Sequence, residues 1–152
     1  MNPQAAQNYF RTRVLTATPE QLQMMLYDGA IRFAEQARAA LGAGDYERSY
    51  QMISRVQKIL TEMTCGLKYD VLPELCEKLA ALYNYVYRRL VDANVGHDVA
   101  AIDEALTLLK YQRETWALLL DQLGKQKAAV AATKIDLPAP DRRMEASISM
   151  KG

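Results

Sequence analysis

Residues that could bind a metal or act as acid–base catalysts are scarce in this chain. It contains one histidine, His97, and two cysteines, Cys65 and Cys76. A carboxylate-bridged metal site in a helical bundle needs Glu-x-x-His pairs, and a structural zinc site needs about four Cys or His ligands. The sequence also has no glycine-rich phosphate loop and no Ser or Cys with a helix-placed histidine as its base. We therefore predict a protein without catalytic residues, a metal or a cofactor.

One charged residue falls on an otherwise apolar stripe. Arg113 lies one helical turn before Trp116 and one after Leu109. A charge on a packing face needs either a partner or a route to water. Two interpretations are open: Arg113 lies at the edge of the stripe, or it pairs with an inward carboxylate, for which Asp28 is the obvious candidate.

Composition limits the classes of partner and the location. The chain has 152 residues, enough for one domain, and a net charge of +1, which gives no case for binding nucleic acid. No apolar run is long enough to cross a membrane, and the N-terminus lacks the order of a signal peptide. Two cysteines without a secretion signal indicate reduced thiols in the cytoplasm. Nine tyrosines against two phenylalanines favour rings that pack while their hydroxyls reach water or a partner.

Four amphipathic helices must position these residues. The first begins with Thr18 as N-cap and Gln21 as the other half of a capping box, and it should end at Gly42 as a left-handed C′ residue. Start signals for the others are Asp45, Pro73 and Asp98, and the last helix should end at Gly124. Short connections predict an all-α, antiparallel, up-down four-helix bundle over residues 18–124. A mobile arm, 1–17, precedes it, and a disordered or partly helical tail, 125–152, follows.

Each helix carries more apolar surface than one inner stripe requires. On the first helix the expected inner stripe is Leu22, Met25, Leu26, Gly29, Phe33, Ala37 and Leu41. Additional lines of Met, Ile and Tyr run beside the stripes: Met24, Tyr27 and Ile31; Met52 and Ile59; Tyr83, Tyr85 and Tyr87. Such lines fit a groove that receives an amphipathic segment, although each residue alone is equally consistent with core packing.

Several stretches resemble the flagellar secretion chaperone FliS family. They are "VLTATPEQLQMMLYDGAIRFAEQA" (14–37), "SRVQKILTEMTCGL" (54–67), "LAALYNYVYRRLVDANVGHD" (79–98) and "LLKYQRETW" (108–116), preceded by Tyr9. The resemblance covers residues 8–123. Thr18 stands where the family more often has Ser, which preserves the capping chemistry, and Gln112 stands where an apolar residue is common.

The resemblance implies a cytoplasmic, non-enzymatic helical bundle. Such a protein binds the disordered C-terminal segment of flagellin, prevents its premature polymerisation and passes it to the flagellar type III export apparatus. Bound flagellin lies in hydrophobic grooves, and the N-terminal arm, which covers a groove in the free protein, moves aside. The alternative is a self-associating structural or regulatory bundle, such as a homodimer, without a flagellin client.

Two sets of site residues follow from the pattern and the resemblance together. The predicted partner-binding residues are Tyr9, Phe10, Val14, Met24, Tyr27, Ile31, Met52, Ile59, Tyr83 and Tyr87. The predicted structural residues are Asp28, Gly29, Arg113 and Trp116. Gly29 lies within the first helix, where glycine costs about 1 kcal/mol relative to alanine, so we expect another helix or a bound segment to approach closely there.

Overall fold

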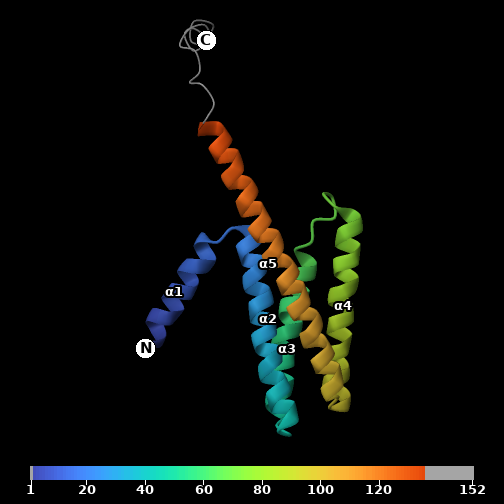
Figure 1. The fold of residues 1–152 in the computed structure, drawn as a ribbon. Coiled ribbons are helices and arrows are strands. Elements are labelled where there is room, and N and C mark those ends of the chain that lie inside the picture. Colours follow the sequence, from blue (N-terminus) through green and yellow to red (C-terminus); the bar gives the residue numbers. More distant parts are fainter. Residues whose placement is uncertain (1, 136–152) are drawn as a thin grey trace, which may run out of the picture. The chain divides into compact units, whose positions relative to one another are not determined.

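The computed structural model describes residues 2–135 and contains only helices over that range. Two compact units divide the chain, Met1–Ala117 and Leu118–Gly152. Figure 1 shows the five helices: α1 (Pro3–Thr16), α2 (Pro19–Gly42), α3 (Tyr46–Cys65), α4 (Pro73–Gly96) and α5 (Val99–Ile135). The predicted all-α fold is therefore confirmed.

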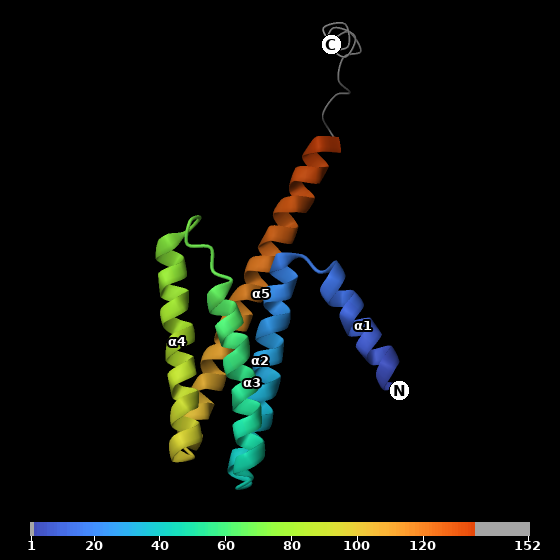
Figure 2. The same ribbon diagram turned by 180° about the vertical axis from the view of Figure 1, so that it is seen from behind.

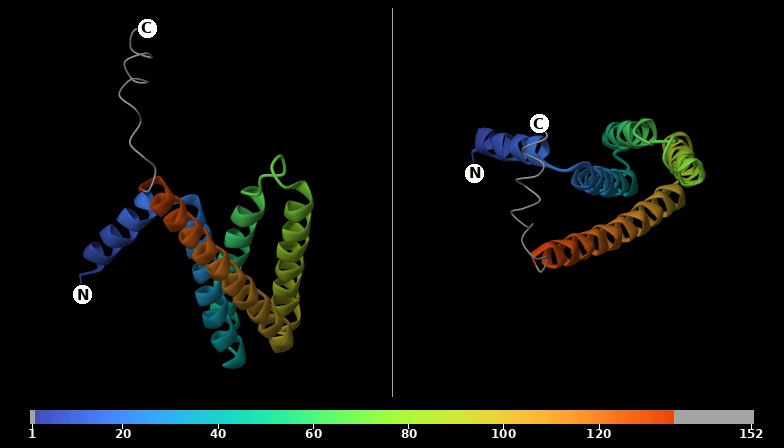
Figure 3. Two further views of the ribbon diagram at one scale, coloured as in Figure 1. Left: turned by 45° about the horizontal axis from the view of Figure 1, so that its top comes forward. Right: turned by 90° about the horizontal axis from the view of Figure 1, so that it is seen from above.

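The bundle of the first unit comprises α2, α3, α4 and the segment 99–117 of α5. Successive members run in opposite directions, as Figures 1 and 2 show from opposite sides. Viewed from above, α3 lies between α2 and α4 (Figure 3). The topology is the expected up-down arrangement, in which short loops join antiparallel neighbours.

Local start signals fix the beginnings of the helices. Thr18 accepts a hydrogen bond from the backbone N–H of Gln21 (3.1 Å), and the Gln21 side chain accepts one from the backbone N–H of Thr18 (3.0 Å), which completes the capping box. Asp45 caps α3 through the N–H of Arg48 (3.2 Å). Asp98 accepts a hydrogen bond from an N–H in the first turn of α5. These predicted starts are confirmed.

Of the two predicted helix ends, one is right in position and the other is wrong. α2 ends at Gly42 as predicted, but the left-handed residue is Gly44, whose φ is +76°. α5 continues through Gly124 to Ile135. A glycine ends a helix only where the chain turns into the left-handed region, and the alanine- and lysine-rich sequence after Gly124 favours helix strongly enough to offset its cost of about 1 kcal/mol. The predicted tail is thus helical over 125–135, and its remainder, 136–152, lies outside the described residues.

The residues before the bundle form a helix of their own. Asn2 caps α1 by accepting a hydrogen bond from the N–H of Gln4 (3.1 Å), and none of the side chains of α1 is buried. α1 belongs to the same compact unit as the bundle. The core is built by α2 to α5 alone.

The face that α2 turns to the core is rich in alanine. Its buried side chains are Tyr27, Ala30, Ala34, Ala37, Ala40 and Leu41. Five of the seven residues expected on its inner stripe, Leu22, Met25, Leu26, Gly29 and Phe33, are only partly buried. Small inner residues let helix backbones approach closely, which moves the larger apolar side chains of α2 to the edge of the bundle. For the second helix the 4-3 spacing predicts a stripe of Tyr46, Ser49, Ile53, Val56, Leu60, Met63 and Leu67. The structure buries the five from Ser49 to Met63, whereas Tyr46 is exposed and Leu67 is partly buried.

Candidate binding groove

An apolar groove of about 750 Å³ is lined by side chains of α1, α2 and α3. The lining residues are Phe10, Arg13 and Val14 of α1, Leu22, Met25, Leu26, Asp28, Gly29, Arg32 and Phe33 of α2, and Ile59 and Glu62 of α3. All of them belong to the first compact unit. The groove has a volume typical of ligand-binding clefts and an apolar floor, so it is suited to hold an apolar side-chain row of a partner segment.

The floor of the groove is rigid because it is also the outer layer of the core. Leu26, Phe33 and Ile59 pack against the buried core residues. A Cβ atom at Gly29 would lie 3.4 Å from Cδ1 of Ile59, which is close to van der Waals contact. A methyl group would therefore fit between α2 and α3 here, and the missing side chain of Gly29 leaves space on the floor of the groove.

α1 supplies one wall of the groove with few anchors. Phe10 and Val14 line the groove, yet Phe10 is 57% exposed and Tyr9 is 67% exposed. Tyr9 carries the guanidinium of Arg13 at 6.0 Å from its ring centroid. Because α1 has few buried contacts, little free energy is needed to detach it from the groove. We therefore expect α1 to be the part of the groove that moves most easily.

A second groove, of about 530 Å³, lies between α3 and α4. Its lining residues are Leu60, Thr61, Thr64, Cys65, Ala80, Ala81, Tyr83, Asn84 and Tyr87. None of them carries a charge at neutral pH. The two grooves therefore differ in chemistry, because only the first has charged residues at its edge.

A buried pair of tyrosines joins α2 to α4. The hydroxyl groups of Tyr27 and Tyr83 are 2.7 Å apart, and each residue is 2% exposed. The Gln23 side chain donates a weaker hydrogen bond to the Tyr83 hydroxyl (3.4 Å). Burial, together with the hydrogen bond to Tyr27, raises the pKa of Tyr83 well above its usual value near 10.

Ion pairs join α2 to the bundle segment of α5. Arg113 donates to Asp28 at 2.5 Å, which confirms the predicted pairing and raises the pKa of Arg113. The pairing hypothesis assumed that Asp28 points inward. The side chains of Arg113 and Asp28 are 37% and 49% exposed, so the pair lies at the edge of the bundle. Two further pairs follow along the same helices, Glu35 with Lys110 (3.1 Å) and Arg38 with Asp103 (2.7 Å).

Trp116 connects α5 to the first turn of α2. Its indole N–H donates a hydrogen bond to the backbone carbonyl of Glu20 (2.9 Å), and its ring packs against the core. The accepting carbonyl lies within the capping box, between Thr18 and Gln21. Trp116 thus holds the start of α2 in place, close to the connection to α1.

Three of the predicted partner-binding residues are in the core. Tyr27, Met52 and Tyr83 are at most 5% exposed. Tyr27 and Met52 line neither groove, so the expectation of an open groove does not fit these two side chains. Tyr83 is buried beside the hydroxyl of Tyr27 but still lines the floor of the second groove, and its role in binding a partner stays a prediction.

The other predicted partner-binding residues are accessible to different degrees. Phe10, Val14 and Ile59 line the first groove, and Tyr87 lines the second. Tyr9 is exposed on α1, and Met24 and Ile31 are partly buried. Their role in binding a partner stays a prediction.

Sequence reasoning missed most of the groove residues on α2. Leu22, Met25, Leu26 and Phe33 were assigned to the inner stripe because they are the larger apolar side chains. The alternative signal was the spacing of Tyr27, Ala30, Ala34, Ala37 and Leu41, which is equally helical. A stripe of small residues is less hydrophobic than a stripe of larger apolar residues, although it marks the closest contact between helices.

Within residues 2–135 no three His, Cys, Asp or Glu side chains gather as metal ligands, and no helix there is long and apolar enough to cross a membrane. His97 follows α4 in a left-handed conformation (φ 50°), and its ring stacks on Tyr46 at 3.6 Å.

The sequence of this chain is similar to those of one known family. The profile of the flagellar protein FliS matches residues 1–123. The chain belongs to the FliS family. It is 35% identical over 126 residues to the flagellar secretion chaperone FliS of Bacillus subtilis, covering 83% of this chain and 92% of that protein. It is also 35% identical over 124 residues to that of Salmonella typhimurium, covering 81% and 92%.

A solved structure has a similar fold. A bacterial flagellar chaperone crystal structure superimposes with a TM-score of 0.65, at 19% sequence identity, over 78% of this chain and 97% of that chain. At that identity the likeness supports the helical bundle alone. Membership of the family rests on the sequence matches.

Proposed function

We propose that this protein is a cytoplasmic export chaperone that binds the disordered C-terminal region of flagellin, keeps it from polymerising prematurely and passes it to the flagellar type III export apparatus. The observation that carries the proposal is the apolar groove between α1, α2 and α3 in a chain of the FliS family. The protein acts by binding, without a catalytic step.

The groove suits a client that folds as it docks. A disordered segment gains affinity by placing an apolar helical face on a preformed surface, and it loses part of that affinity to its own ordering. Leu26, Phe33 and Ile59 are held in place by the core, so the chaperone side has little ordering to do.

We further propose that residues 1–17 act as a movable arm. Phe10 and Val14 occupy one side of the groove without being buried, so a client can displace them at low cost. Deletion of residues 1–16 should increase the rate of client association, or expose the groove to self-association. An unchanged rate together with an unchanged oligomeric state would contradict this role of the arm.

The decisive experiment is co-purification of the full chain with the flagellin C-terminal segment, followed by calorimetry. Binding at about micromolar concentration or tighter is expected. Light scattering on the same samples gives the oligomeric state. No binding, combined with a stable homodimer, would refute the chaperone proposal and favour the self-associating bundle.

A further inference from the structure

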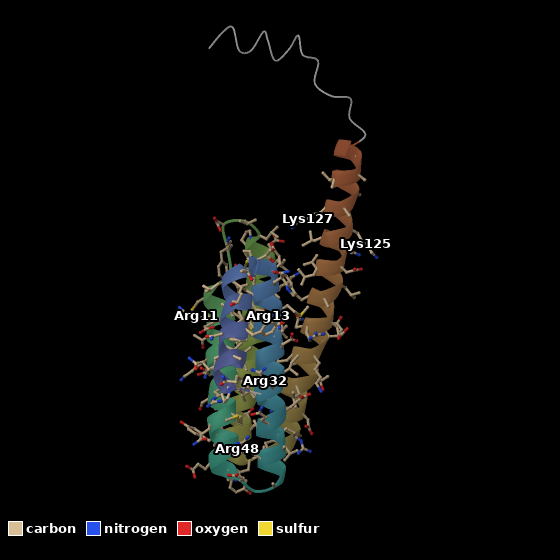
Figure 4. All side chains as sticks on the ribbon, turned by 90° about the vertical axis from the view of Figure 1, so that its left-hand side faces the viewer. Arg11, Arg13, Arg32, Arg48, Lys125 and Lys127 are labelled. Carbon is tan, nitrogen blue, oxygen red and sulfur yellow. The ribbon has the colours of Figure 1, made fainter. Side chains whose placement is uncertain are left out.

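The edge of the α1–α2–α3 groove carries guanidinium groups without partners. Arg13 and Arg32 line the groove, and Figure 4 labels both on the same side of the first unit. The guanidinium of Arg32 lies 5.2 Å from the ring centroid of Phe33, and that of Arg55 lies 5.3 Å from the same centroid. Among residues 2–135, none of these three arginines forms an ion pair.

Carboxylates on the groove do not balance these charges. Asp28 lines the groove, but Arg113 already binds it at 2.5 Å. Glu62 is the other acidic lining residue. Once α1 has moved aside, Arg32 on the groove and Arg55 beside the lining residue Phe33 face the carboxylate of Glu62, which leaves an excess of positive charge beside the apolar floor.

This excess belongs to the first groove and not to the chain in general. The net charge of the whole chain is only +1, and the lining of the α3–α4 groove has no charged side chain. Phe33 holds two of the arginines by cation–π contacts, which limits their freedom before any partner binds. Fixed, unpaired guanidinium groups are well suited to accept carboxylates.

We propose that this groove selects an acidic amphipathic helical segment of a protein, with Arg32 and Arg55 as its specificity-determining residues, since Arg13 belongs to the arm that the client displaces. The apolar face of the segment lies on Leu26, Phe33 and Ile59, and carboxylates along its edges pair with the arginines. This inference rests on the proposed function, because it assumes that the groove holds a client segment. It adds that the segment carries negative charge where it lies in the groove. A nucleic acid fits poorly, because its phosphates would face an apolar floor.

The test uses the full chain and three synthetic amphipathic peptides of about 18 residues with the same apolar face. Their edge positions are all Glu, all Gln or all Lys. The Glu peptide should bind at least about tenfold more tightly than the Lys peptide at about 50 mM salt, and this preference should shrink at about 300 mM. R32Q and R55Q should each weaken binding of the Glu peptide about three- to tenfold and leave binding of the Gln peptide unchanged.

Arg88 supplies a matched control, because it is an exposed arginine of α4 outside both grooves. R88Q should bind all three peptides as the unaltered chain does. Thermal melts followed by circular dichroism establish that each variant is folded. Equal affinity for the Glu and Lys peptides would overturn the proposal, as would an equal loss for all peptides in R32Q and R55Q. Arginine-dependent binding to anionic lipid vesicles without discrimination among the peptides would also overturn it.

The flagellin C-terminal segment is measured in parallel with the three peptides. If it fails to bind while the Glu peptide shows arginine-dependent preference, the proposed function fails and the charge selectivity of the groove stands. If it binds while the peptides are not discriminated, the charge selectivity fails alone.

Discussion

Tyr83→Phe should destabilise the bundle more than Tyr27→Phe, although each change removes one hydroxyl group. The two hydroxyls are 2.7 Å apart in the core, but only that of Tyr83 has a second partner, the Gln23 side chain at 3.4 Å. After Tyr27→Phe, the Tyr83 hydroxyl keeps Gln23. After Tyr83→Phe, the Tyr27 hydroxyl is left buried with no other hydrogen bond among the described residues.

The expected magnitudes follow from this asymmetry. Loss of a hydrogen bond whose remaining partner is satisfied costs about 1 kcal/mol, and a buried hydroxyl left unpaired costs about 1–3 kcal/mol. We expect about 1 kcal/mol for Tyr27→Phe and about 2 kcal/mol for Tyr83→Phe. The double variant leaves neither hydroxyl unpaired, so its cost should be about 1 kcal/mol, well below the sum of the two single variants.

Urea unfolding followed by circular dichroism measures these differences, provided that the slope with urea is the same in all variants. Tyr50→Phe is the control, because Tyr50 is 62% exposed on α3, and its effect should stay within about 0.5 kcal/mol. A cost of the double variant equal to the sum of the two single costs would refute this explanation. So would a larger cost for Tyr27→Phe than for Tyr83→Phe, because Gln23 would then not be a partner of Tyr83 alone.

Three other predictions concern titration, the ion pair and the groove. The raised pKa of Tyr83 contributes stability that is complete below about pH 10, where tyrosines of the unfolded chain are neutral, and that is lost as the pH rises further. Urea titrations above that pH should show the free energy of unfolding falling by up to about 1.4 kcal/mol per pH unit. Tyr83→Phe should remove this fall. Because the pair of Asp28 and Arg113 is half exposed, a double-mutant cycle with alanine should give a coupling below about 1 kcal/mol, and a larger value would place the pair in a drier site than the structure does. Gly29→Ala should leave the melting temperature equal or raise it, because the new methyl group would contact only the end of the Ile59 side chain. Gly29→Leu should weaken client binding, because the larger side chain would fill the groove. A Gly29→Leu variant with full affinity for the client would contradict the assignment of this groove as the binding site.

The elements that sequence predicted well are those with local signals. The capping box of Thr18 and Gln21 and the cap at Asp45 need only residues three positions apart, so the helix starts were found. The ends were harder, because Gly42 and Gly124 look alike as C-terminal glycines and only the conformation of the following chain distinguishes them from Gly44. That conformation depends on which helix the loop must reach.

The groove was harder to predict because burial is decided between helices. Periodicity on α2 allows two stripes, one of larger apolar residues such as Leu26 and Phe33, and one of alanines such as Ala30 and Ala34. The structure buries the alanines, because close approach of several backbones offers more contact than one layer of leucines would. The pair of Asp28 and Arg113 was found from the sequence because a charge on a packing stripe needs a partner whichever stripe is buried.

The Tyr-Asp-Gly sequence in the middle of α2 follows from this arrangement. Consecutive residues of a helix point about 100° apart, so three in a row face three different neighbours. Tyr27 bonds to Tyr83 of α4, Asp28 pairs with Arg113 of α5, and Gly29 lies against Ile59 of α3 on the floor of the groove. The three consecutive residues thus give α2 a different contact with each of the other three helices at one level of the bundle.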